Sequence, residues 1–414
     1  MDLKSAYKTI MDDHFPAQME LSFSDDSGRQ TLYYEKVSWL IDGIQKGLRY
    51  GENPGQEAAM YKLVNGNLVL GAVESIKPGR WLSSDPELLQ SGKHPGKLNL
   101  TDVDNALNIL RYILDKPCAI IIKHNNPCGA AKADTLAEAY HKANMADRLA
   151  AFGGAIALNR ECDIETAKLI SENYAEVVAA PEFAPGVMDI FAKKKNLRVM
   201  RIKNIAKLSE YVAKQTIDLK SMMDGGLIVQ WSYVPLARKR EDLLPAQATY
   251  KGAEYKMNRQ PTDKEYDDMV FGWLVEAGVT SNSVIYVKDG VTVGIGTGEQ
   301  DRVGVAEIAR DKAYRKLSDR IAWEKFKIPF NNITDAKAKK EIEEEVASKH
   351  GGLPGCTMVS DGFFPFRDGI EVGLREGVKS VVQPGGSDRD FESIQACNEF
   401  KSAMVFTGQR SFKH

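Results

Sequence analysis

The sequence lacks the features that mark membrane, secreted and zinc-dependent proteins. No apolar run approaches the roughly 18 to 20 residues of a membrane-spanning helix, and the first 16 residues contain no apolar core of a signal peptide. The five cysteines are scattered and include no CxxC pair, and the six histidines form no HExxH motif. Disulfides and a structural zinc site are therefore not expected. These absences predict a cytosolic protein that holds no zinc.

Net charge is also nearly absent. The chain carries 55 basic and 57 acidic side chains, a formal balance of −2. This balance gives no electrostatic reason to expect nucleic acid or a membrane surface as a partner. The chain also contains no GxxxxGK[ST] motif, so a P-loop ATP site is disfavoured. Any anionic ligand must be bound by a few local groups.

The length of 414 residues is too great for one ordinary hydrophobic core. We predict an N-terminal extension with a short helix and a hairpin, two α/β subdomains, and a polar helical insert or linker between them. In chain order, the extension is residues 1–40, the first subdomain 41–195, the insert 196–265 and the second subdomain 266–414.

The two subdomains show the same order of expected elements. Residues 118–181 are predicted to form a strand, a helix, a strand, a helix and a strand, and residues 282–385 repeat this order with a longer insertion. Alternating strands and helices favour an α/β fold whose sheets are covered on both faces. We interpret the repeat as an internal duplication, with two unrelated α/β domains as the alternative.

The stretch "AIIIKHNNPCGAA" brings a lysine and a histidine to the end of an apolar strand. The strand is apolar on both faces, so it is expected to be buried, and Asn, Pro and Gly predict a turn directly after it. His124 can accept a proton near neutral pH, and Lys123 can stabilise developing negative charge. A purely structural pair is the alternative. Cys128 in the same turn is interpreted as a small core residue rather than a nucleophile.

Three other stretches carry side chains suited to ligands. Arg49 and Tyr50 in "GLRYGENPGQEAAMY" suit a phosphate and a base, although a plain surface loop has the same composition. Arg302 follows a GxGxG loop at a helix start, where a bound anion would explain a basic residue. In "SDGFFPFRDG" aromatic rings adjoin carboxylates, which suits a flat heterocycle with N–H donors or a capped core cluster.

Taken together, these stretches resemble the transformylase domain of the bifunctional purine enzymes. Those enzymes formylate AICAR (5-aminoimidazole-4-carboxamide ribonucleotide) and cyclise the product to inosine monophosphate. The resemblance covers about residues 45 to 414, in the order of the family. Its most specific pieces are "LRYGENPGQ", "KHNNPCGAA", "AFGGAIALNR", "GGLIVQ", "SNSVIYVKDG", "GIGTGEQDRV", "SDGFFPFRDG", "VVQPGGSDRD" and "MVFTGQRSFKH". It implies two tandem cytidine-deaminase-like three-layer α/β/α units with the helical insert between them.

The resemblance also implies a reaction and a set of residues. A formyl group passes from 10-formyltetrahydrofolate to the 5-amino group of AICAR, with His124 as proton acceptor, Lys123 as its partner and Asn282 near the formyl group. The implied AICAR-binding residues are Arg49, Tyr50, Asn99, Gly226 and Arg410. The implied folate-binding residues are Arg302, Phe363, Phe366, Asp368, Ser387 and Asp388. Some members hold a structural potassium ion, and Ser281, Ser283, Asp361 and His414 occupy the matching positions. The family implies a homodimer with active sites at the interface.

Only about 45 residues precede "LRYGENPGQ", far fewer than the family's cyclohydrolase domain. The expected activity is therefore AICAR formylation in purine biosynthesis without ring closure. One alternative is a non-catalytic nucleotide- or folate-binding relative, and another is an enzyme that uses formate and ATP. The preferred folate, the source of the cyclohydrolase step and any assembly beyond a dimer are not encoded in recognisable motifs.

Overall fold

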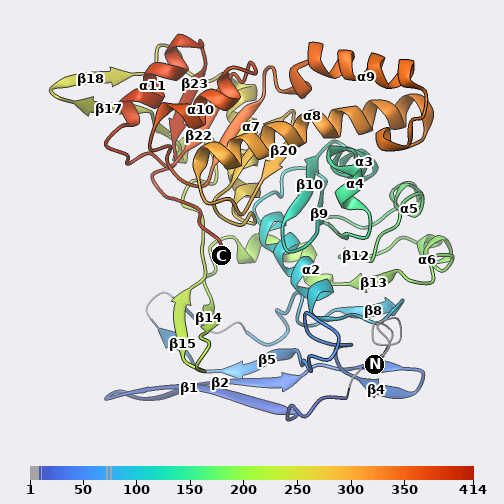
Figure 1. Cartoon of the computed structure of the whole chain (residues 1–414). Coiled ribbons are helices and arrows are strands. Elements are labelled where there is room, and N and C mark those ends of the chain that lie inside the picture. Colours follow the sequence, from blue (N-terminus) through green and yellow to red (C-terminus); the bar gives the residue numbers. More distant parts are fainter. Residues whose placement is uncertain (1–8, 11, 71–72, 75–76) are drawn as a thin grey trace. The chain divides into compact units, whose positions relative to one another are not determined.

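The computed structural model describes residues 9–10, 12–70, 73–74 and 77–414. The chain divides into two compact units, and each is built from two separate parts of the sequence (Figure 1). The first unit comprises the described residues of Met1–Leu114 together with Gly153–Val234, and the second comprises Asp115–Phe152 together with Pro235–His414.

The first unit contains an antiparallel sheet in the order β1-β2-β5 and a second sheet segment in the order β11-β12-β13-β8. In the second segment β11, β12 and β13 are parallel, whereas β8 is antiparallel to β13. The strands are β1 (Gln18–Asp25), β2 (Gly28–Lys36), β3 (Trp39–Ile41), β4 (Ile44–Lys46), β5 (Tyr61–Gly66), β6 (Val69–Leu70), β7 (Val73–Glu74), β8 (Glu87–Gln90), β11 (Ala155–Leu158), β12 (Val177–Ala180), β13 (Arg198–Arg201), β14 (Ile217–Ser221) and β15 (Leu227–Trp231). The helices are α2 (Lys97–Leu110), α5 (Ile164–Ser171), α6 (Val187–Phe191) and the 3-10 helix η1 (Lys203–Tyr211).

The second unit is built on strands in the order β16-β23-β22-β21-β19-β20-β10-β9. Only β21, β22 and β23 are parallel neighbours. The strands are β9 (Cys118–Ile122), β10 (Pro127–Lys132), β16 (Leu244–Pro245), β17 (Gln247–Tyr250), β18 (Ala253–Lys256), β19 (Val284–Lys288), β20 (Val291–Gly296), β21 (Thr357–Ser360), β22 (Ser380–Gln383) and β23 (Ala403–Phe406). The helices are α3 (Leu136–Ala146), α4 (Arg148–Ala151), η2 (Arg240–Asp242), α7 (Asp263–Glu276), α8 (Arg302–Phe326), η3 (Phe330–Asn332), α9 (Ala336–Ser348), η4 (His350–Gly352), α10 (Arg367–Leu374) and α11 (Asp390–Glu399).

Apolar side chains from strands and helices form the core of the second unit. β19, β21, β22 and β23 contribute buried residues to one cluster with α8, α10 and α11. Every residue of β9 is buried, as the run of isoleucines predicts. All five cysteines are free; Cys118, Cys162, Cys356 and Cys397 are buried, and Cys128 is half-buried.

The α/β class predicted from the sequence is confirmed. The predicted N-terminal hairpin is present as β1 and β2, which pair from Gln18–Glu35 to Asp25–Gly28. The short helix predicted before it lies mainly outside the described residues. The element order expected for residues 118–181 appears as β9, α3, β11, α5 and β12, whereas the deaminase-like duplication stays a prediction.

The prediction of a helical insert at residues 196–265 is wrong. The described structure of this segment consists of β13 to β18, with 3-10 turns and only the start of α7. Two local features explain the difference. In η1, Lys207 has non-helical angles (φ −117°, ψ 21°). In the β17–β18 hairpin, Lys251 and Gly252 both have positive φ (48° and 82°), which is the backbone of a two-residue hairpin turn.

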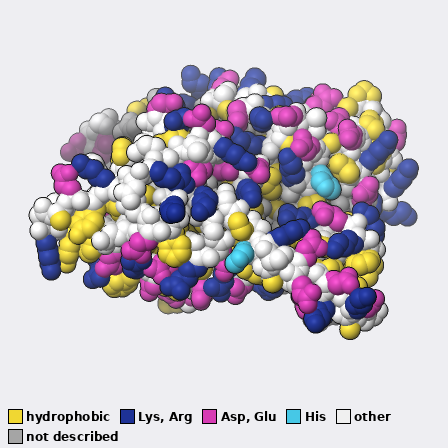
Figure 2. All heavy atoms as spheres, turned by 90° about the horizontal axis from the view of Figure 1, so that it is seen from above, with side chains coloured by type: hydrophobic (Ala, Val, Ile, Leu, Met, Phe, Trp, Pro, Cys, Tyr) yellow, Lys and Arg dark blue, Asp and Glu magenta, His cyan; other side chains and the backbone are white. Residues whose placement is uncertain are grey.

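Basic and acidic side chains are intermixed over the face drawn in Figure 2, as the small net charge leads one to expect. In the described part of the chain, no helix combines the length and the apolar character needed to cross a membrane.

Candidate functional site

Lys123 and His124 lie in the tight turn between β9 and β10. The turn is closed by a hydrogen bond from Lys123 N to Asn126 O (2.9 Å). Asn125 has φ 53°, in the left-handed region that asparagine tolerates. The side chain of His124 is exposed, whereas Lys123 Nζ donates to Phe152 O (2.5 Å). The turn thus presents an imidazole to solvent beside an ammonium group that the backbone holds in place.

Hydrogen bonds attach this turn to two distant segments of the second unit. Asn126 Oδ1 accepts from Thr280 N (2.8 Å), two residues before Asn282. Lys413 Nζ donates to Asn125 O (2.8 Å). The three catalytic candidates from the sequence therefore lie on segments that are bonded to one another.

Cys128 lies in the same turn region as a half-buried thiol. Its Sγ contacts Ile121 O at 3.4 Å, and burial raises the pKa of the thiol to about 12. A thiol with this pKa is protonated at neutral pH and is a poor nucleophile. The interpretation of Cys128 as a core residue is consistent with this environment.

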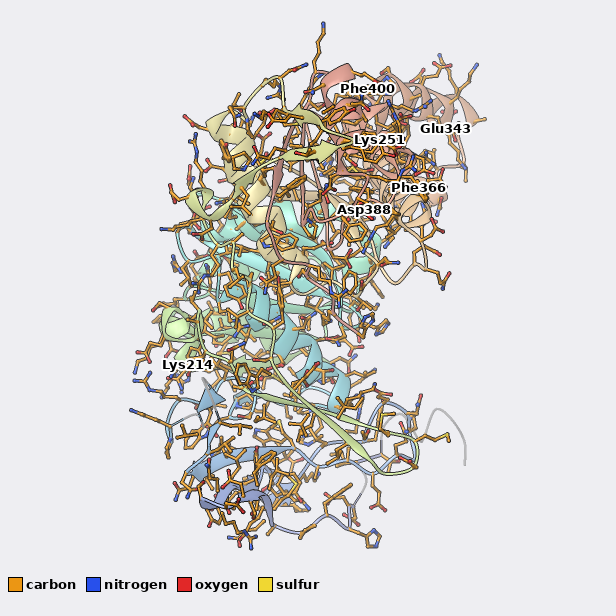
Figure 3. All side chains as sticks on the ribbon, turned by 90° about the vertical axis from the view of Figure 1, so that its left-hand side faces the viewer. Lys214, Lys251, Glu343, Phe366, Asp388 and Phe400 are labelled. Carbon is orange, nitrogen blue, oxygen red and sulfur yellow. The ribbon has the colours of Figure 1, made fainter. Side chains whose placement is uncertain are left out.

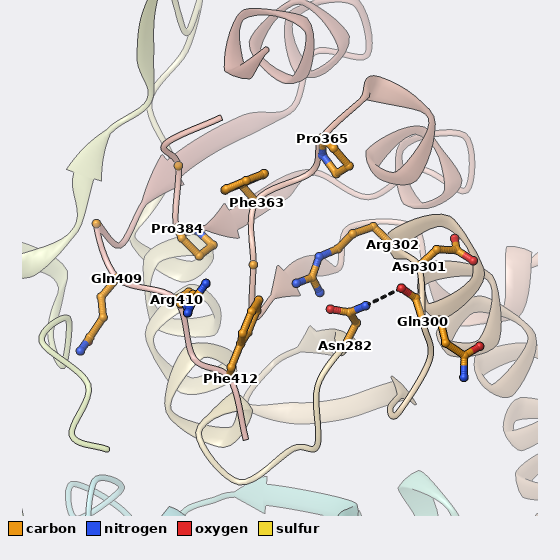
Figure 4. A pocket seen from close by; sticks show the side chains of 13 residues that line it. Asn282, Gln300, Asp301, Arg302, Phe363, Pro365, Pro384, Gln409, Arg410 and Phe412 are labelled. Atoms are coloured by element: carbon orange, nitrogen blue, oxygen red, sulfur yellow. Dashed lines mark hydrogen bonds between the residues drawn. The ribbon is translucent and has the colours of Figure 1, made fainter. Parts of the chain in front are cut away.

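Asn282 opens onto a cavity of about 480 Å³ in the second unit (Figure 4). Its Nδ2 donates to Gln300 O (3.0 Å), which fixes the orientation of the amide. The volume falls in the range of ordinary small-molecule sites. The cavity is lined by Asn282, Gln300, Asp301, Arg302, Gly362, Phe363, Pro365, Pro384, Gly385, Gly408, Gln409, Arg410 and Phe412.

Arg302, in the first turn of α8, forms an ion pair with Asp361. The Asp361 side chain is fully buried and that of Arg302 is only 10% exposed. The second carboxylate oxygen of Asp361 accepts from Ser281 Oγ (2.5 Å). This pair explains a basic residue at a helix start without any bound anion, while Arg302 still lines the cavity.

A second carboxylate, Glu276, is buried next to this pair. Ser283 Oγ donates to Glu276 Oε1 (2.6 Å). Burial and the charge of Asp361 raise the pKa of Glu276 well above its usual value. Within the described residues, Glu276 Oε2 and Ser411 Oγ are buried and have no hydrogen-bond partner. Ser411 N donates to Asp361 O (2.8 Å), so the two unsatisfied oxygens belong to neighbouring segments.

These oxygens suit a monovalent cation, because carboxylate, hydroxyl and carbonyl oxygens are the donors that hard cations bind. Ser281, Ser283 and Asp361, predicted for potassium, are gathered here. His414 is exposed, with its ring centroid 6.2 Å from that of Phe412. Glu276 and Ser411 were missed, because neither belongs to a motif and only the fold buries them. No group of three or more His, Cys, Asp or Glu side chains suited to a metal ion occurs in the described ranges.

The other folate candidates lie in the same unit, on loops except for Asp368, which is in the first turn of α10. Phe363 is 43% exposed and Phe366 is 53% exposed, although large aromatic side chains are usually buried. The guanidinium of Arg389 lies 5.2 Å from the ring centroid of Phe366. Figure 3 labels Phe366 and Asp388, which both belong to the second unit. Phe363 lines the cavity, whereas Phe366, Asp368, Ser387 and Asp388 do not.

The nucleotide candidates of the first unit form a separate group. Arg49 Nη2 donates to Tyr50 Oη (2.9 Å), and both residues are buried. Asn99 is buried as well, and its Oδ1 accepts from Gly96 N (3.1 Å). Gly226 lies in the exposed turn between β14 and β15. Arg410 belongs to the second unit, so the structure divides the predicted AICAR residues between the units.

Comparison with known proteins identifies the class to which this fold and these residues belong. The model of the AICARFT/IMPCHase bienzyme family matches residues 4–312. The chain therefore belongs to this family.

Its relatives include the bifunctional purine biosynthesis protein PurH of several bacteria. The protein from Magnetococcus marinus is 36% identical over 395 residues, which cover 95% of this chain and 64% of the relative. That from Persephonella marina is 38% identical over 89% of this chain and 59% of its own length. That from Chlorobium phaeobacteroides is 35% identical over 100% of this chain and 65% of its own length. The chain thus spans about three fifths to two thirds of these relatives.

Proposed function

We propose that this chain transfers the formyl group of 10-formyltetrahydrofolate to the 5-amino group of AICAR, a step of purine biosynthesis. The observation that carries the proposal is the exposed His124 turn, bonded to the segment of Asn282 beside a cavity of about 480 Å³. A proton acceptor, a cation and an amide donor are thereby assembled in one unit. Formyl transfer to a weakly nucleophilic amine requires these groups.

His124 is the general base in this proposal. The amino group of AICAR is conjugated with its ring and carboxamide, so it is a poor nucleophile unless its proton is removed during attack. The bond from the amino nitrogen to the formyl carbon forms, and the bond from that carbon to N10 of the folate breaks. One proton passes from the amino nitrogen to His124, and N10 gains one proton as it leaves.

Lys123 and Asn282 stabilise the tetrahedral intermediate. Lys123 is held by Phe152 O, and its ammonium can move to the oxyanion or donate the proton that N10 requires. The amide of Asn282, oriented by Gln300 O, can donate to the same oxyanion or bind the carboxamide. Neither group forms a covalent bond with the substrate, so Cys128 needs no part in the reaction.

The folate occupies the cavity and the adjoining loops. The exposed rings of Phe363 and Phe366 offer faces to a pterin, and Asp368 can accept from its N–H groups. Asp368 Oδ1 accepts from Gly369 N (2.8 Å), and its carboxylate is exposed, so further acceptor positions are open. Ser387 and Asp388 are proposed to bind the polar part of the folate.

The proposed AICAR-binding residues are Arg49, Tyr50, Asn99, Gly226 and Arg410. Arg49 and Arg410 carry the positive charge for the phosphate. Ser281, Ser283 and Asp361, together with Glu276 and Ser411, would hold a potassium ion if one binds. The ion would supply positive charge beside the buried carboxylate of Glu276.

A homodimer is proposed from the exposed hairpin β14–β15. Leu227, Ile228, Val229 and Trp231 are 57%, 51%, 44% and 46% exposed, and an isolated two-stranded hairpin is marginal in water. A second copy of the chain is the proposed cover, which would place Gly226 of this hairpin at a subunit interface.

Replacing Ile228 by Asp is expected to weaken the dimer about 100-fold, because burying a carboxylate in an apolar interface costs about 3 kcal/mol or more. Sedimentation velocity over a concentration series measures the dissociation. Leu40 on β3 is also an exposed apolar residue (68% exposed) but lies outside the hairpin, so Leu40→Asp is the matched control and should remain dimeric. A monomeric wild type, or an unchanged Ile228→Asp variant, contradicts the proposal.

The function is tested by incubating the purified chain with AICAR and 10-formyltetrahydrofolate. Free tetrahydrofolate and formylated AICAR are expected to accumulate in equal amounts, and inosine monophosphate is quantified in the same samples. Binding of AICAR without turnover would support the non-catalytic alternative. Turnover only with formate and ATP would support the other enzyme class.

A further inference from the structure

Arg198, at the start of β13, is an arginine that no motif singles out and that is only 1% exposed. Its Nε and Nη2 both donate to His94 O (3.2 and 3.1 Å). Its Nη1 lies 3.5 Å from both Glu176 O and Glu176 Oε2. Burying a guanidinium is costly even when it is paired. This cost suggests that the buried guanidinium of Arg198 has a role in positioning its neighbours or in supplying positive charge.

The contact with His94 holds the segment that carries Arg49. His94 has φ 57°, and its Nε2 lies 2.5 Å from Gly47 O, so that nitrogen carries the proton. Arg49 N donates to Pro95 O (2.9 Å), the residue after His94. Hydrogen bonds thus hold residues 93–97 beside residues 47–50. Arg198 holds residues 93–97 in place through its hydrogen bonds to His94 O.

The contact with Glu176 reaches Asn99. Asn99 Nδ2 donates to Glu176 Oε2 (3.1 Å), the oxygen that Arg198 also approaches. Arg198 therefore contacts His94 and Glu176, the residues that help to position Arg49, Tyr50 and Asn99. Gly226 is the AICAR candidate of the first unit that this network does not reach. Its planar guanidinium directs donors at fixed angles to the His94 carbonyl and to the Glu176 carboxylate, an arrangement that the single ammonium nitrogen of a lysine does not reproduce.

The charges of this cluster favour an anion. Arg49 and Arg198 lie close enough to repel each other, and Glu176, whose side chain is 37% exposed, is the carboxylate that interacts with Arg198. Burial, chiefly, lowers the pKa of Arg198 to about 10. Burial, with the charges of Lys46, Arg198 and Arg49, also lowers the pKa of His94. A phosphate dianion bound beside the two guanidiniums would offset their repulsion.

We propose that Arg198 is a positioning residue of the nucleotide site, which holds Arg49, Tyr50 and Asn99 in place and adds positive charge for a phosphate monoester. This inference rests on the proposed function for the identity of the nucleotide. The cluster itself favours an anionic group such as a phosphate.

The test compares Arg198→Met and Arg198→Lys with Arg201→Met. Arg201 lies on the same strand but pairs with Glu87 and Glu182, outside the cluster. For Arg198→Met the KM for AICAR is expected to rise at least tenfold, with kcat at saturating AICAR within threefold of wild type and the KM for folate unchanged. Arg198→Lys keeps the positive charge but loses the planar guanidinium, so its KM for AICAR should lie between those of wild type and Arg198→Met. Arg201→Met should have the wild-type KM.

Binding of ribose 5-phosphate and of the AICAR nucleoside, measured by calorimetry, tests the role of Arg198 independently of the proposed formyltransferase activity. Arg198→Met should weaken ribose 5-phosphate at least tenfold and the nucleoside less than threefold. Weakening of ribose 5-phosphate in a protein that never formylates AICAR would reject the proposed function alone. A folded Arg198→Met with wild-type affinity for ribose 5-phosphate, or equal losses in both KM values and in kcat, would reject the role of Arg198. If Arg198→Met does not fold, the KM ratio of Arg198→Lys decides: a rise for AICAR alone supports the role, and no rise rejects it.

Discussion

Replacing His124 by Ala is expected to lower kcat by roughly 10²- to 10⁴-fold, the range of general-base contributions, while AICAR still binds. The imidazole is exposed and lies in a turn whose closing bonds are made by Lys123 N, Asn126 and Lys413. Removing it should therefore leave the fold and the nucleotide contacts intact. Single-turnover rates with saturating AICAR and folate measure the chemical step directly, and calorimetry measures binding.

His141 provides the control for this substitution. It is an exposed histidine on α3 of the same unit, away from the turn, and His141→Ala should keep wild-type turnover and stability. If His124→Ala turns over at the wild-type rate, the imidazole is not the base. If it fails to bind AICAR, His124 belongs to the binding contacts instead.

Replacing Asp361 by Asn is expected to destabilise the protein by about 3 to 5 kcal/mol, the cost of leaving a buried charge without its partner. The carboxylate is fully buried and its two oxygens serve Arg302 and Ser281. The amide keeps the shape but gives Arg302 no compensating charge. Urea unfolding, monitored by intrinsic fluorescence, gives the change in free energy.

Two further variants make this result specific. Asp289 forms an exposed pair with Lys264 (side chains 52% and 69% exposed), and Asp289→Asn should cost less than about 1 kcal/mol. The double variant Asp361→Asn with Arg302→Met should recover part of the lost stability, because replacing both members of a buried pair is often nearly neutral. It should not recover activity, since Arg302 lines the cavity. Wild-type stability of Asp361→Asn would contradict the assigned pair.

The sequence predicts local features well where their cause is local. The isoleucines of β9 need burial on both faces, and Asn125, Asn126 and Pro127 favour the turn that follows, so the position of Lys123 and His124 could be anticipated. The hairpin β1–β2 has the same local origin. The assignment of β9 and β10 to the unit of residues 235–414 could not be anticipated. It depends on pairing across more than a hundred residues, such as Ala131 with Val291.

Polar residues buried by the fold were the least predictable part of the site. Glu276 is the last residue of α7, and Arg198 follows three lysines in a charged stretch, and neither residue belongs to a motif that marks it as functional. Their importance comes from partners far along the chain, Ser283 and Asp361 for Glu276, and His94 and Glu176 for Arg198. The 3-10 character of η1 had no such signal either, because its composition is that of an α-helix.

The shielding of the native cysteines makes the molecule well suited to site-directed labelling. Cys118, Cys162, Cys356 and Cys397 are buried, and burial raises the pKa of Cys128, Cys356 and Cys397 to about 12. Thiolates, which react with maleimides, are therefore scarce at neutral pH. A cysteine introduced at an exposed position outside the β14–β15 hairpin, such as Glu343 on α9, would carry almost all of the dye, with no need to remove the native thiols. Energy transfer between donor- and acceptor-labelled copies would then follow subunit exchange in the proposed dimer.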